Sequence, residues 1–333
     1  MTDGGNIPGT DDARRDGERL VLVRLAGELA IKSRRTRAGF QRRLERNLVD
    51  ALTPVGGRVD ARWDRIYVRS ATDAPLTVLP RVFGLSSFSR IDAVVPADLT
   101  RILEAGVATY AGRLAGKRFA VRARRSGRHP FNSQDIHVEL GAALLPHAAG
   151  VDLDHPDVTV HVEVRDDRAY LFAGRVDGAG GLPLGVEGNA LALISGGYDS
   201  AVAAWLLLKR GVSLDYVFCN LGGDAYERAV VQVAKVLADD WSYGSRPRLH
   251  VVDFAGAVDD LRANVKQSYW QVVLKRLMYR TASWIGEELD AGAVVTGEAM
   301  GQVSSQTLAN LRAIEPASSL PVFRPLLGFD KNE

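Results

Sequence analysis

Cysteine is almost absent from this sequence, which contains one, Cys219, among 333 residues. A single cysteine excludes an intramolecular disulfide, a multi-cysteine zinc site and a cysteine-ligated metal–sulfur cluster within this chain. The sequence also lacks an apolar run long enough to span a bilayer. Residues 1–17 are polar and lack the apolar segment of a signal peptide, so we expect a disordered leader and a cytoplasmic protein.

The net charge is also small, because the 42 basic residues are nearly balanced by 40 acidic ones. The basic residues are nevertheless clustered. No acid interrupts those between Arg113 and Arg128, and only Glu45 interrupts a second cluster over residues 32–46. Solvated helix faces would explain either cluster alone. Two such clusters in one N-terminal half favour a polyanionic partner such as nucleic acid.

The chain is longer than one core usually organises, so we expect several domains. Strand patterns at 19–25 and 65–70 flank a helical spacing at 36–52, and a short helix, a turn at Gly84 and a strand follow. This β-α-β-α-β order predicts a ferredoxin-like α+β domain over residues 18–95.

A second unit is expected over residues 96–178. It contains a helix from residue 99, a strand that ends in a basic turn, and a helix that starts after the cap-like Asn132 and Ser133. Two alternating strands joined at Asp166 and Asp167 predict a hairpin. The glycine-rich residues 179–188 are expected to be a linker.

From residue 189 to 333, continuous apolar strands alternate with helices, including one long helix over 257–288. This rhythm predicts a Rossmann-like, doubly wound parallel sheet covered on both faces, so the fold class is α/β.

The stretch LALISGGYDS, residues 191–200, places a glycine turn between an expected buried strand and an expected helix. Helix N-termini beyond the carboxyl ends of parallel strands bind anions. Gly196 and Gly197 let the backbone approach a phosphate closely, and Ser195 and Ser200 can donate hydrogen bonds. Asp199 would repel phosphates unless a cation intervened, so we expect Mg²⁺ to bridge it to a nucleotide.

This loop lacks the Gly-Lys-Ser/Thr ending of a Walker A sequence and the G-x-G-x-x-G fingerprint. A tight turn without a ligand is the simplest alternative, but Asp199 and the flanking elements favour a nucleotide site. The pattern S-G-G-x-D-S after a buried strand resembles the pyrophosphate loop of ATP pyrophosphatases, which cleave ATP between the α and β phosphates.

Further stretches extend this resemblance to the tRNA 4-thiouridine synthetase family, also called tRNA sulfurtransferase or thiamine-biosynthesis sulfurtransferase. In the C-terminal half they are GGLPLGVEGNALALISGGYDSAVAAWLLLKRG at 180–211, VVLKRLMYRTAS at 272–283, VVTGEAMGQVSSQTLANLRAI at 294–314 and PVFRPLLGFDK at 321–331. Upstream, RLAGELAIKSRRTRAGF at 24–40 resembles the family's ferredoxin-like domain. FAVRARRSGRHPFNSQDI at 119–136 and HVEVRDDRAYLFAGRVDGAGGLP at 161–183 resemble its THUMP RNA-binding domain.

The resemblance implies an activity. The two N-terminal domains would bind the tRNA acceptor region, and the third would use ATP to adenylate the 4-oxygen of uridine-8. A persulfide sulfur from a cysteine desulfurase would then displace AMP to give 4-thiouridine. The family is also implicated in supplying sulfur for the thiamine thiazole, through a thiamine sulfur-carrier protein, and its members can form homodimers through their N-terminal halves.

The resemblance also implies roles for individual residues. Asp199 and Lys331 would be catalytic, Asp199 through Mg²⁺-ATP and Lys331 by stabilising the adenylation transition state. From the residues alone, Lys275 and Gln306 would be ordinary helix-surface residues, and Gly297 a plain helix-start glycine. The resemblance instead assigns ATP binding to Leu193, Ile194, Ser195, Gly196, Gly197, Ser200, Lys275, Gly297 and Gln306.

For tRNA phosphates we expect contacts from Arg122, Arg124, Arg125 and Arg128. Phe131, which follows them, would stack on a terminal base or, more simply, pack inside the domain.

The sequence departs from the family in one respect. The family's sulfur-carrying cysteine follows the DK motif, and this sequence ends at Glu333 without it, for which a truncated chain is the simplest explanation. Cys219 lies in an apolar strand and is expected to be inert packing rather than a substitute.

The sequence leaves two alternative functions open. One is a tRNA-binding THUMP module whose catalytic domain adenylates but cannot transfer sulfur. The other is a different pyrophosphate-loop enzyme, such as a tRNA 2-thiolase or an amide-forming synthetase.

Overall fold

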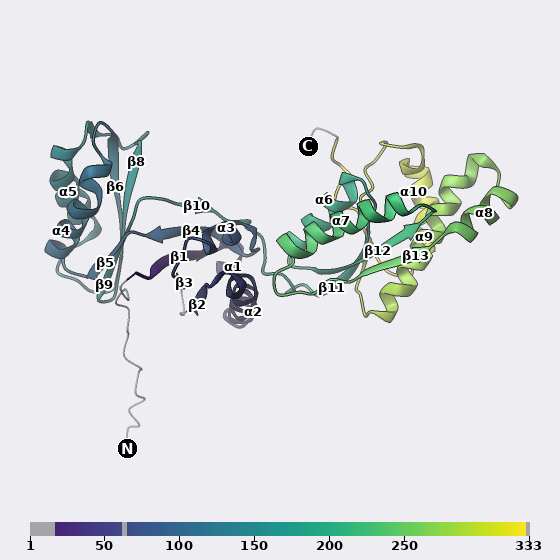
Figure 1. Ribbon diagram of the computed structural model, residues 1–333, viewed down its shortest axis with the longest axis horizontal. Helices are drawn as coiled ribbons and strands as arrows, with labels where there is room; N and C mark the ends of the chain where they lie inside the picture. Colours follow the sequence, from purple (N-terminus) through teal and green to yellow (C-terminus); the bar gives the residue numbers. More distant parts are fainter. Residues whose placement is uncertain (1–16, 62–64, 331–333) are drawn as a thin grey trace, which may run out of the picture. The chain divides into compact units, whose positions relative to one another are not determined.

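The computed structural model describes residues 17–61 and 65–330, so nearly all of the expected leader lies outside the described residues. The chain divides into two compact units (Figure 1). One comprises residues 1–24, 56–75 and 87–176, and the other comprises residues 25–55, 76–86 and 177–333.

The N-terminal sheet has the strand order β10-β4-β1-β3-β2. β1 pairs antiparallel with β3, and β3 pairs antiparallel with β2. The ferredoxin-like fold is confirmed, although the short strand β2 was not expected from the sequence. The elements of this region are β1 (Arg19–Leu25), α1 (Gly27–Ala30), α2 (Arg34–Leu52), β2 (Arg58–Ala61), β3 (Ile66–Ser70), α3 (Pro75–Val78), β4 (Leu85–Ile91) and β10 (Val176–Asp177).

The second sheet has the order β5-β9-β8-β6-β7 and carries the helices α4 and α5 on one face. An Asn132–Asp135 capping box starts α5, and the expected hairpin turns at Asp166, whose φ is 48°. Phe131 is buried in this core, so it packs inside the domain. The elements are β5 (Ala93–Pro96), α4 (Leu99–Tyr110), β6 (Arg118–Ser126), α5 (Ser133–Leu144), β7 (Gly150–Val151), β8 (Val158–Arg165) and β9 (Arg168–Phe172).

The third sheet is parallel in all its pairings, with the order β13-β12-β11-β14-β15. Numbered from β11 along the chain this is the order 3-2-1-4-5 of a doubly wound sheet, with its switch point between β11 and β14. Its elements are β11 (Asn189–Leu193), α6 (Tyr198–Lys209), β12 (Ser213–Asn220), α7 (Asp224–Trp241), β13 (Leu249–Asp253), α8 (Ala255–Asn264), α9 (Trp270–Glu288), β14 (Val294–Val295), α10 (Leu308–Ile314) and β15 (Val322–Phe323).

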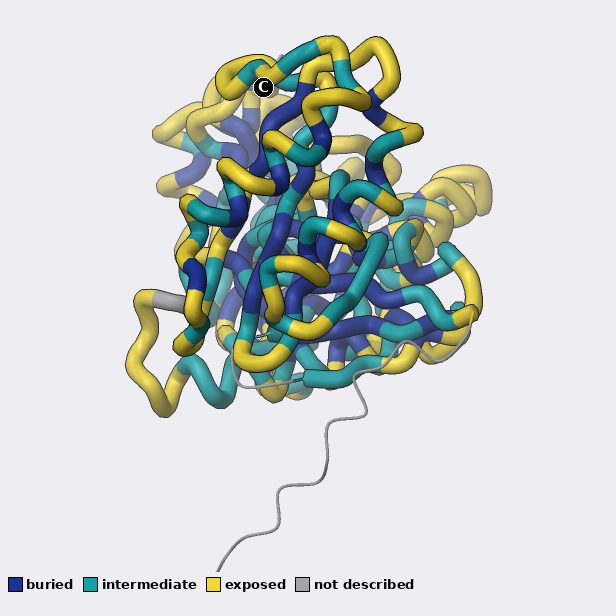
Figure 2. The backbone as a smooth tube through the Cα atoms, turned by 90° about the vertical axis from the view of Figure 1, so that its left-hand side faces the viewer, coloured by how far each residue is buried: buried dark blue, intermediate teal, exposed yellow. Residues whose placement is uncertain are grey.

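Helices cover both faces of this sheet, as the sequence predicted. Residues of α6 and α7 pack in one cluster with alternate strand residues such as Ala192 and Tyr216. The intervening residues, such as Leu191 and Val217, pack with α9. Figure 2 shows buried stretches of the backbone enclosed by intermediate and exposed ones.

The single long helix expected over 257–288 is wrong. The structure breaks it into α8 and α9, with Val265 in an extended conformation (φ −116°, ψ 129°) and a short 3-10 turn at Gln267–Tyr269. Asn264 and Val265 are both poor helix formers, and the side chain of Val265 packs into an apolar cluster with Leu261 and Leu274. Tertiary packing therefore outweighs the helical periodicity at this point.

The glycine-rich residues 179–188 pack closely within their unit. The carbonyl of Leu184 accepts from Arg43 Nε at 2.7 Å and from Asn47 Nδ2 at 3.1 Å. A Cβ on Gly181, whose φ is +70°, would lie 2.1 Å from the Lys209 carbonyl oxygen. Arg43, part of the second basic cluster, is thus engaged with backbone carbonyls.

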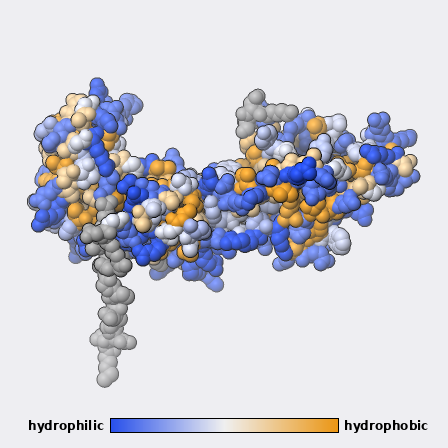
Figure 3. Space-filling model, viewed as in Figure 1, coloured by the Kyte–Doolittle hydropathy of each residue, from blue (hydrophilic) through white to orange (hydrophobic). Residues whose placement is uncertain are grey.

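Hydrophilic residues dominate the surface seen in Figure 3, and apolar residues form smaller areas between them. Among the described residues, no helix combines the length and the apolar character that crossing a membrane requires.

Candidate functional site

A cavity of about 570 Å³ opens at the carboxyl ends of β11, β12 and β14, beside the N-terminus of α6. This is the switch point of the sheet, where doubly wound folds bind ligands. The cavity is lined by Leu193, Ile194, Ser195, Gly196, Asp199, Ser200, Phe218, Cys219, Asn220, Leu221, Gly222, Tyr226, Lys275, Met278, Tyr279, Thr296, Gly297, Glu298 and Gln306. Nearly every described residue expected to bind ATP therefore lines one space; the exception is Gly197, the residue before α6.

The glycine loop is ordered by its own serines. The Ser200 hydroxyl accepts from the Ser195 amide at 3.0 Å, and the Gly197 amide donates to Ser195 Oγ at 3.3 Å. Gly196 and Gly197 have no positive φ, and a Cβ on either would meet only ordinary contacts in this structure. Gly196 and Gly197 therefore suit a phosphate site because, without side chains, they leave open space beside the backbone amides at the start of α6.

Gly297 lines the cavity and also lies against the glycine loop, so the nearest obstacle to a side chain there is the protein itself. A Cβ on Gly297 would lie 2.5 Å from Ser200 N and 2.6 Å from the carbonyl carbon of Asp199. Gly297 thus lets the segment after β14 lie against the first turn of α6.

Asp199 is exposed in the first turn of α6 and has one oxygen engaged, because Gln302 Nε2 donates to its Oδ2 at 2.9 Å. Gln302 was not among the expected residues. The sequence gives no direct signal for it beyond its place in GQVSSQT. No cluster of three or more His, Cys, Asp or Glu side chains that could hold a metal ion occurs in the described ranges.

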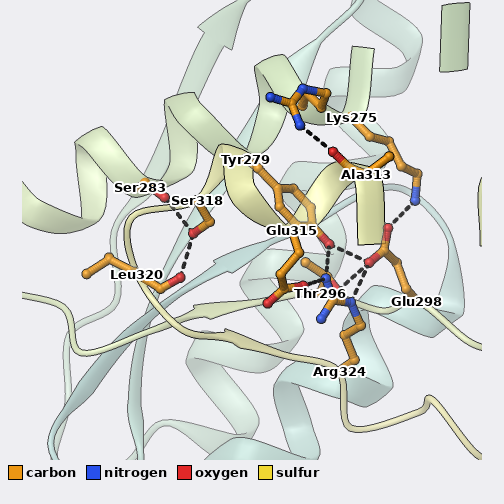
Figure 4. Close-up of polar contacts among 11 residues, drawn as sticks. Lys275, Tyr279, Ser283, Thr296, Glu298, Ala313, Glu315, Ser318, Leu320 and Arg324 are labelled. Atoms are coloured by element: carbon orange, nitrogen blue, oxygen red, sulfur yellow. Dashed lines mark hydrogen bonds and ion pairs between the residues drawn. The ribbon is translucent and has the colours of Figure 1, made fainter. Parts of the chain in front are cut away.

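Lys275 projects from α9 to the cavity wall, where its Nζ lies 2.5 Å from Glu298 Oε1 (Figure 4). Glu298 is 4% exposed and also accepts from Arg324 Nε at 3.0 Å and from the Tyr279 hydroxyl. Burial opposes ionisation of Glu298, but Lys275 and the hydrogen bonds from Tyr279 and Arg324 hold the pKa of its carboxyl below its usual value. The carboxylate is thus charged and compensated.

Gln306 is buried, although a helix-surface position was the alternative expectation. Its Oε1 has no hydrogen-bond partner within the part of the chain that the structure describes, and the residue lines the cavity. A buried acceptor without a donor costs about 1–3 kcal/mol, so this atom is suited to receive a hydrogen bond from a ligand.

The sequence reasoning missed several lining residues, including Phe218, Asn220, Tyr226 and Glu298. Phe218 and Asn220 end a strand at the ligand-binding edge of the sheet, and that position was the available signal. Cys219 lies between them and is buried, and burial raises the pKa of its thiol to about 12. At neutral pH it is therefore protonated, as expected for inert packing.

The four arginines expected to contact tRNA lie on β6 and in the turn that follows it. Arg122, Arg124 and Arg128 are exposed, while Arg125 is partly buried. Arg125 donates to the Gly127 carbonyl at 2.6 Å, so its side chain is engaged in the turn. Within the described part of the chain, neither Arg124 nor Arg128 has a hydrogen-bond or ion-pair partner.

Alternation along β6 separates its two faces. Phe119, Val121 and Ala123 pack into the core with α4 and α5, so Arg122 and Arg124 lie on the opposite face. In the register of β6 with β8, Arg122 is opposite His161 and Arg124 is opposite Glu163. Burial and the nearby arginines lower the pKa of His161 to about 4, so its ring is neutral at pH 7.

A second concavity brings Arg175, which lies outside the expected basic clusters, together with Lys117 of the first cluster. It has a volume of about 710 Å³, and Thr159 and His161 also line it. Lys331, the remaining expected catalytic residue, lies outside the described residues.

Comparison with known families divides the chain in the same order as the fold. Residues 20–89 match the ThiI ferredoxin-like domain, residues 96–173 match the THUMP domain, and residues 185–333 match the family Thiamine biosynthesis protein (ThiI).

Similar proteins and solved structures point to the same family as these matches. The chain is 38% identical to a probable tRNA sulfurtransferase of Sulfurisphaera tokodaii, covering 94% of this chain and 84% of the relative. It is 42% identical to a tRNA sulfurtransferase of Marinobacter nauticus, covering 94% of this chain but 66% of that protein. A crystal structure of a 4-thiouridine synthetase–RNA complex with bound ATP matches with a TM-score of 0.84 and 33% identity, over 94% of this chain and 82% of that one. The chain belongs to the ThiI family of tRNA sulfurtransferases.

Proposed function

We propose that this chain uses ATP to adenylate the 4-oxygen of uridine-8 in tRNA with release of pyrophosphate, and that the terminal sulfur of a persulfide then displaces AMP. A second thiol, acting as the reductant, would cleave the resulting S–S bond, which gives 4-thiouridine and a disulfide. The observation that carries the proposal is the cavity at the switch point of the parallel sheet. It joins a helix N-terminus suited to anions, a lysine, and a buried amide oxygen that has no partner among the described residues. Support also comes from a similar protein whose structure was solved with RNA and ATP.

The residues present fit ATP. The amides at the start of α6 and the Lys275 ammonium suit a polyphosphate, because both present positive charge to the cavity. The Gln306 Oε1 receives no hydrogen bond from residues 17–61 or 65–330 and suits the amino group of adenine or a ribose hydroxyl. Apolar walls from Leu193, Ile194 and Phe218 suit the flat base.

Mg²⁺ fits the same site through Asp199. Its Oδ2 accepts from Gln302, which fixes the carboxylate and leaves Oδ1 for a cation. Mg²⁺ in such sites takes one or two carboxylates together with phosphate oxygens. Bound there, it would offset the charge of the phosphates, and Lys331 would add a cation near the transferring group.

For tRNA, the exposed Arg122, Arg124 and Arg128 provide phosphate contacts. The sulfur requires a persulfide donor, which we assign to a cysteine desulfurase. A role in supplying a thiamine sulfur-carrier protein and pairing of two copies belong to the same proposal.

A second candidate function rests on Cys219. It is the single cysteine of this sequence and its thiol is buried and protonated. A chain of this composition would adenylate tRNA but would not carry sulfur itself.

One assay tests both candidates. The chain is incubated with an unmodified tRNA transcript and Mg²⁺-ATP, with and without a cysteine desulfurase and cysteine. We expect pyrophosphate release that depends on the tRNA. Thiolation with the desulfurase supports the full reaction, whereas release without thiolation supports the second candidate. Binding of tRNA without pyrophosphate release would contradict both.

A further inference from the structure

We propose that Glu298 is a positioning residue, whose carboxylate holds the Lys275 ammonium at the cavity wall where the polyphosphate of ATP is contacted. This inference rests on the proposed ATP site and extends it to a residue that touches the chemistry only through Lys275. Figure 4 shows Lys275 and Tyr279 on α9 reaching Glu298, which follows β14, with Arg324 approaching from the segment after β15.

The two oxygens of Glu298 have different partners. Oε1 accepts from Lys275 Nζ at 2.5 Å. Oε2 accepts from Arg324 Nε at 3.0 Å, from Thr296 Oγ1 at 3.3 Å and from the Tyr279 hydroxyl. The side chain is therefore fixed by one set of donors and offers its other oxygen to Lys275.

This division keeps the buried charge compensated when Lys275 turns toward a ligand. Arg324 is 11% exposed and remains beside Glu298, and Glu315 in turn contacts Arg324. Leaving a buried carboxylate without a cation would be strongly destabilising, because the charge would lose its compensation away from water. Because Arg324 prevents this cost, Lys275 can be shared between Glu298 and a phosphate.

Holding Lys275 in advance has a kinetic benefit. A displacement of about 1 Å at a reacting centre can lower the rate about 100-fold. Glu298 therefore matters for the rate of phosphoryl chemistry more than for the affinity for ATP.

Glu298→Gln separates these effects, because it keeps the shape of the side chain and removes its charge. Without the ion pair, the Lys275 ammonium is no longer shared with a carboxylate, so it interacts more strongly with the phosphates. Its side chain, however, is no longer fixed in position. We expect kcat for tRNA-dependent pyrophosphate release to fall about 10- to 100-fold, with the KM for ATP unchanged or lower. ATP binding measured by calorimetry should likewise be no weaker.

Two further variants make the test specific. In a Lys275→Met background, Glu298→Gln should change kcat less than about threefold, because its effect passes through Lys275. Glu288→Gln is the matched control. It makes the same change at an exposed position of α9, about 20 Å along the helix from Lys275, and should leave both constants unchanged.

The inference is overturned if Glu298→Gln raises the KM for ATP with kcat unchanged. It is also overturned if Glu298→Gln lowers kcat by the same factor in the Lys275→Met background as in the unaltered chain. If Glu298→Gln unfolds, as thermal melting would show, Tyr279→Phe takes its place. It removes one donor to Oε2 and should lower kcat severalfold without raising KM, and an unaltered kcat overturns the inference. An unaltered chain that binds no ATP would instead overturn the proposed function itself.

Discussion

Gly297 and Ser200 bring the segment after β14 so close to the first turn of α6 that no side chain fits between them. A Cβ on Gly297 would lie 2.5 Å from Ser200 N, and the obstacle is backbone, which cannot rotate away. The glycine loop and the segment that carries Glu298 are therefore fixed to one another by direct backbone contact.

Gly297→Ala should accordingly displace the glycine loop. We expect it to lower the free energy of unfolding by about 1–3 kcal/mol and to weaken ATP binding more than tenfold. Gly292→Ala is the control, since its Cβ would meet Asn189 O at an ordinary 3.7 Å. Thermal melting and calorimetry with ATP check both variants. Equal behaviour of the two would contradict the close approach.

Asp199→Ala should abolish tRNA-dependent pyrophosphate release and leave tRNA affinity nearly intact. The reason is that Asp199 lies at the cavity, whereas the exposed arginines of β6 lie in the other compact unit. Asp239→Ala, which removes an exposed surface pair with Lys235, serves as the control. Filter binding of labelled tRNA and a pyrophosphate assay measure the two effects. A parallel loss of both would argue against separate roles.

Arg124 and Arg128 are the arginines best placed to contact phosphates. Replacing both by Ala should weaken tRNA binding and reduce the slope of log affinity against log salt by about one unit per lost contact. Arg101→Ala on α4, which removes an exposed pair with Glu104, should leave the slope unchanged. An unchanged slope in the Arg124/Arg128 double variant would remove these residues from the interface.

Arg125 is expected to behave differently from its neighbours. Its guanidinium donates to Gly127 O and lies 3.2 Å from His129 Nδ1, so Arg125→Ala should loosen the turn. We expect faster amide hydrogen exchange in the turn that contains Gly127 and His129, with a smaller change of the salt slope than Arg124→Ala gives. A larger change of slope would instead place Arg125 on the RNA.

The lowered pKa of His161 predicts that the stability of the fold depends on pH. Its pKa in the fold is about 4, lowered by burial and by Arg24, Arg175, Arg122 and Arg124, against 6.5 for an ordinary histidine. The unfolded chain therefore takes up a proton as pH falls below 6.5, while the folded chain does so only near 4. Stability contributed by the neutral ring is present above pH 6.5 and is lost between these values.

Such a difference in pKa corresponds to about 3 kcal/mol in the free energy of unfolding. Because the ring is only half-buried, solvent screening lowers this contribution to about 1–2 kcal/mol. His161→Asn should remove this part of the pH dependence. Urea unfolding of both proteins between pH 4 and 7 measures the difference. Parallel curves for the two proteins would show that His161 does not titrate in this way.

The fold followed from the sequence wherever local pattern and tertiary packing agreed. The strand at 19–25, the helix that ends at Leu52 and the alternation of strands and helices after residue 189 were all predicted. The break at Val265 was not, because the apolar spacing continues through it and only the side-chain packing marks it. The two-residue strand β15 is too short for any periodicity to show.

The candidate site was predictable to the extent that its residues are contiguous. The glycine loop combines a strand end, two glycines and a helix start within ten residues, so its chemistry can be read locally. Glu298 and Lys275 are 23 residues apart, and Arg324 is 26 residues beyond Glu298. Their meeting depends on the path of α9 and β15, which no local pattern specifies.

The burial of Cys219 makes the chain a convenient scaffold for site-directed chemistry. Because its one native sulfhydryl is sheltered and protonated, a cysteine introduced at an exposed position would be the preferred target of maleimide dyes and spin labels. Distances between a label on β6 and one on α7 could then be measured with and without RNA, without first replacing any residue of this sequence.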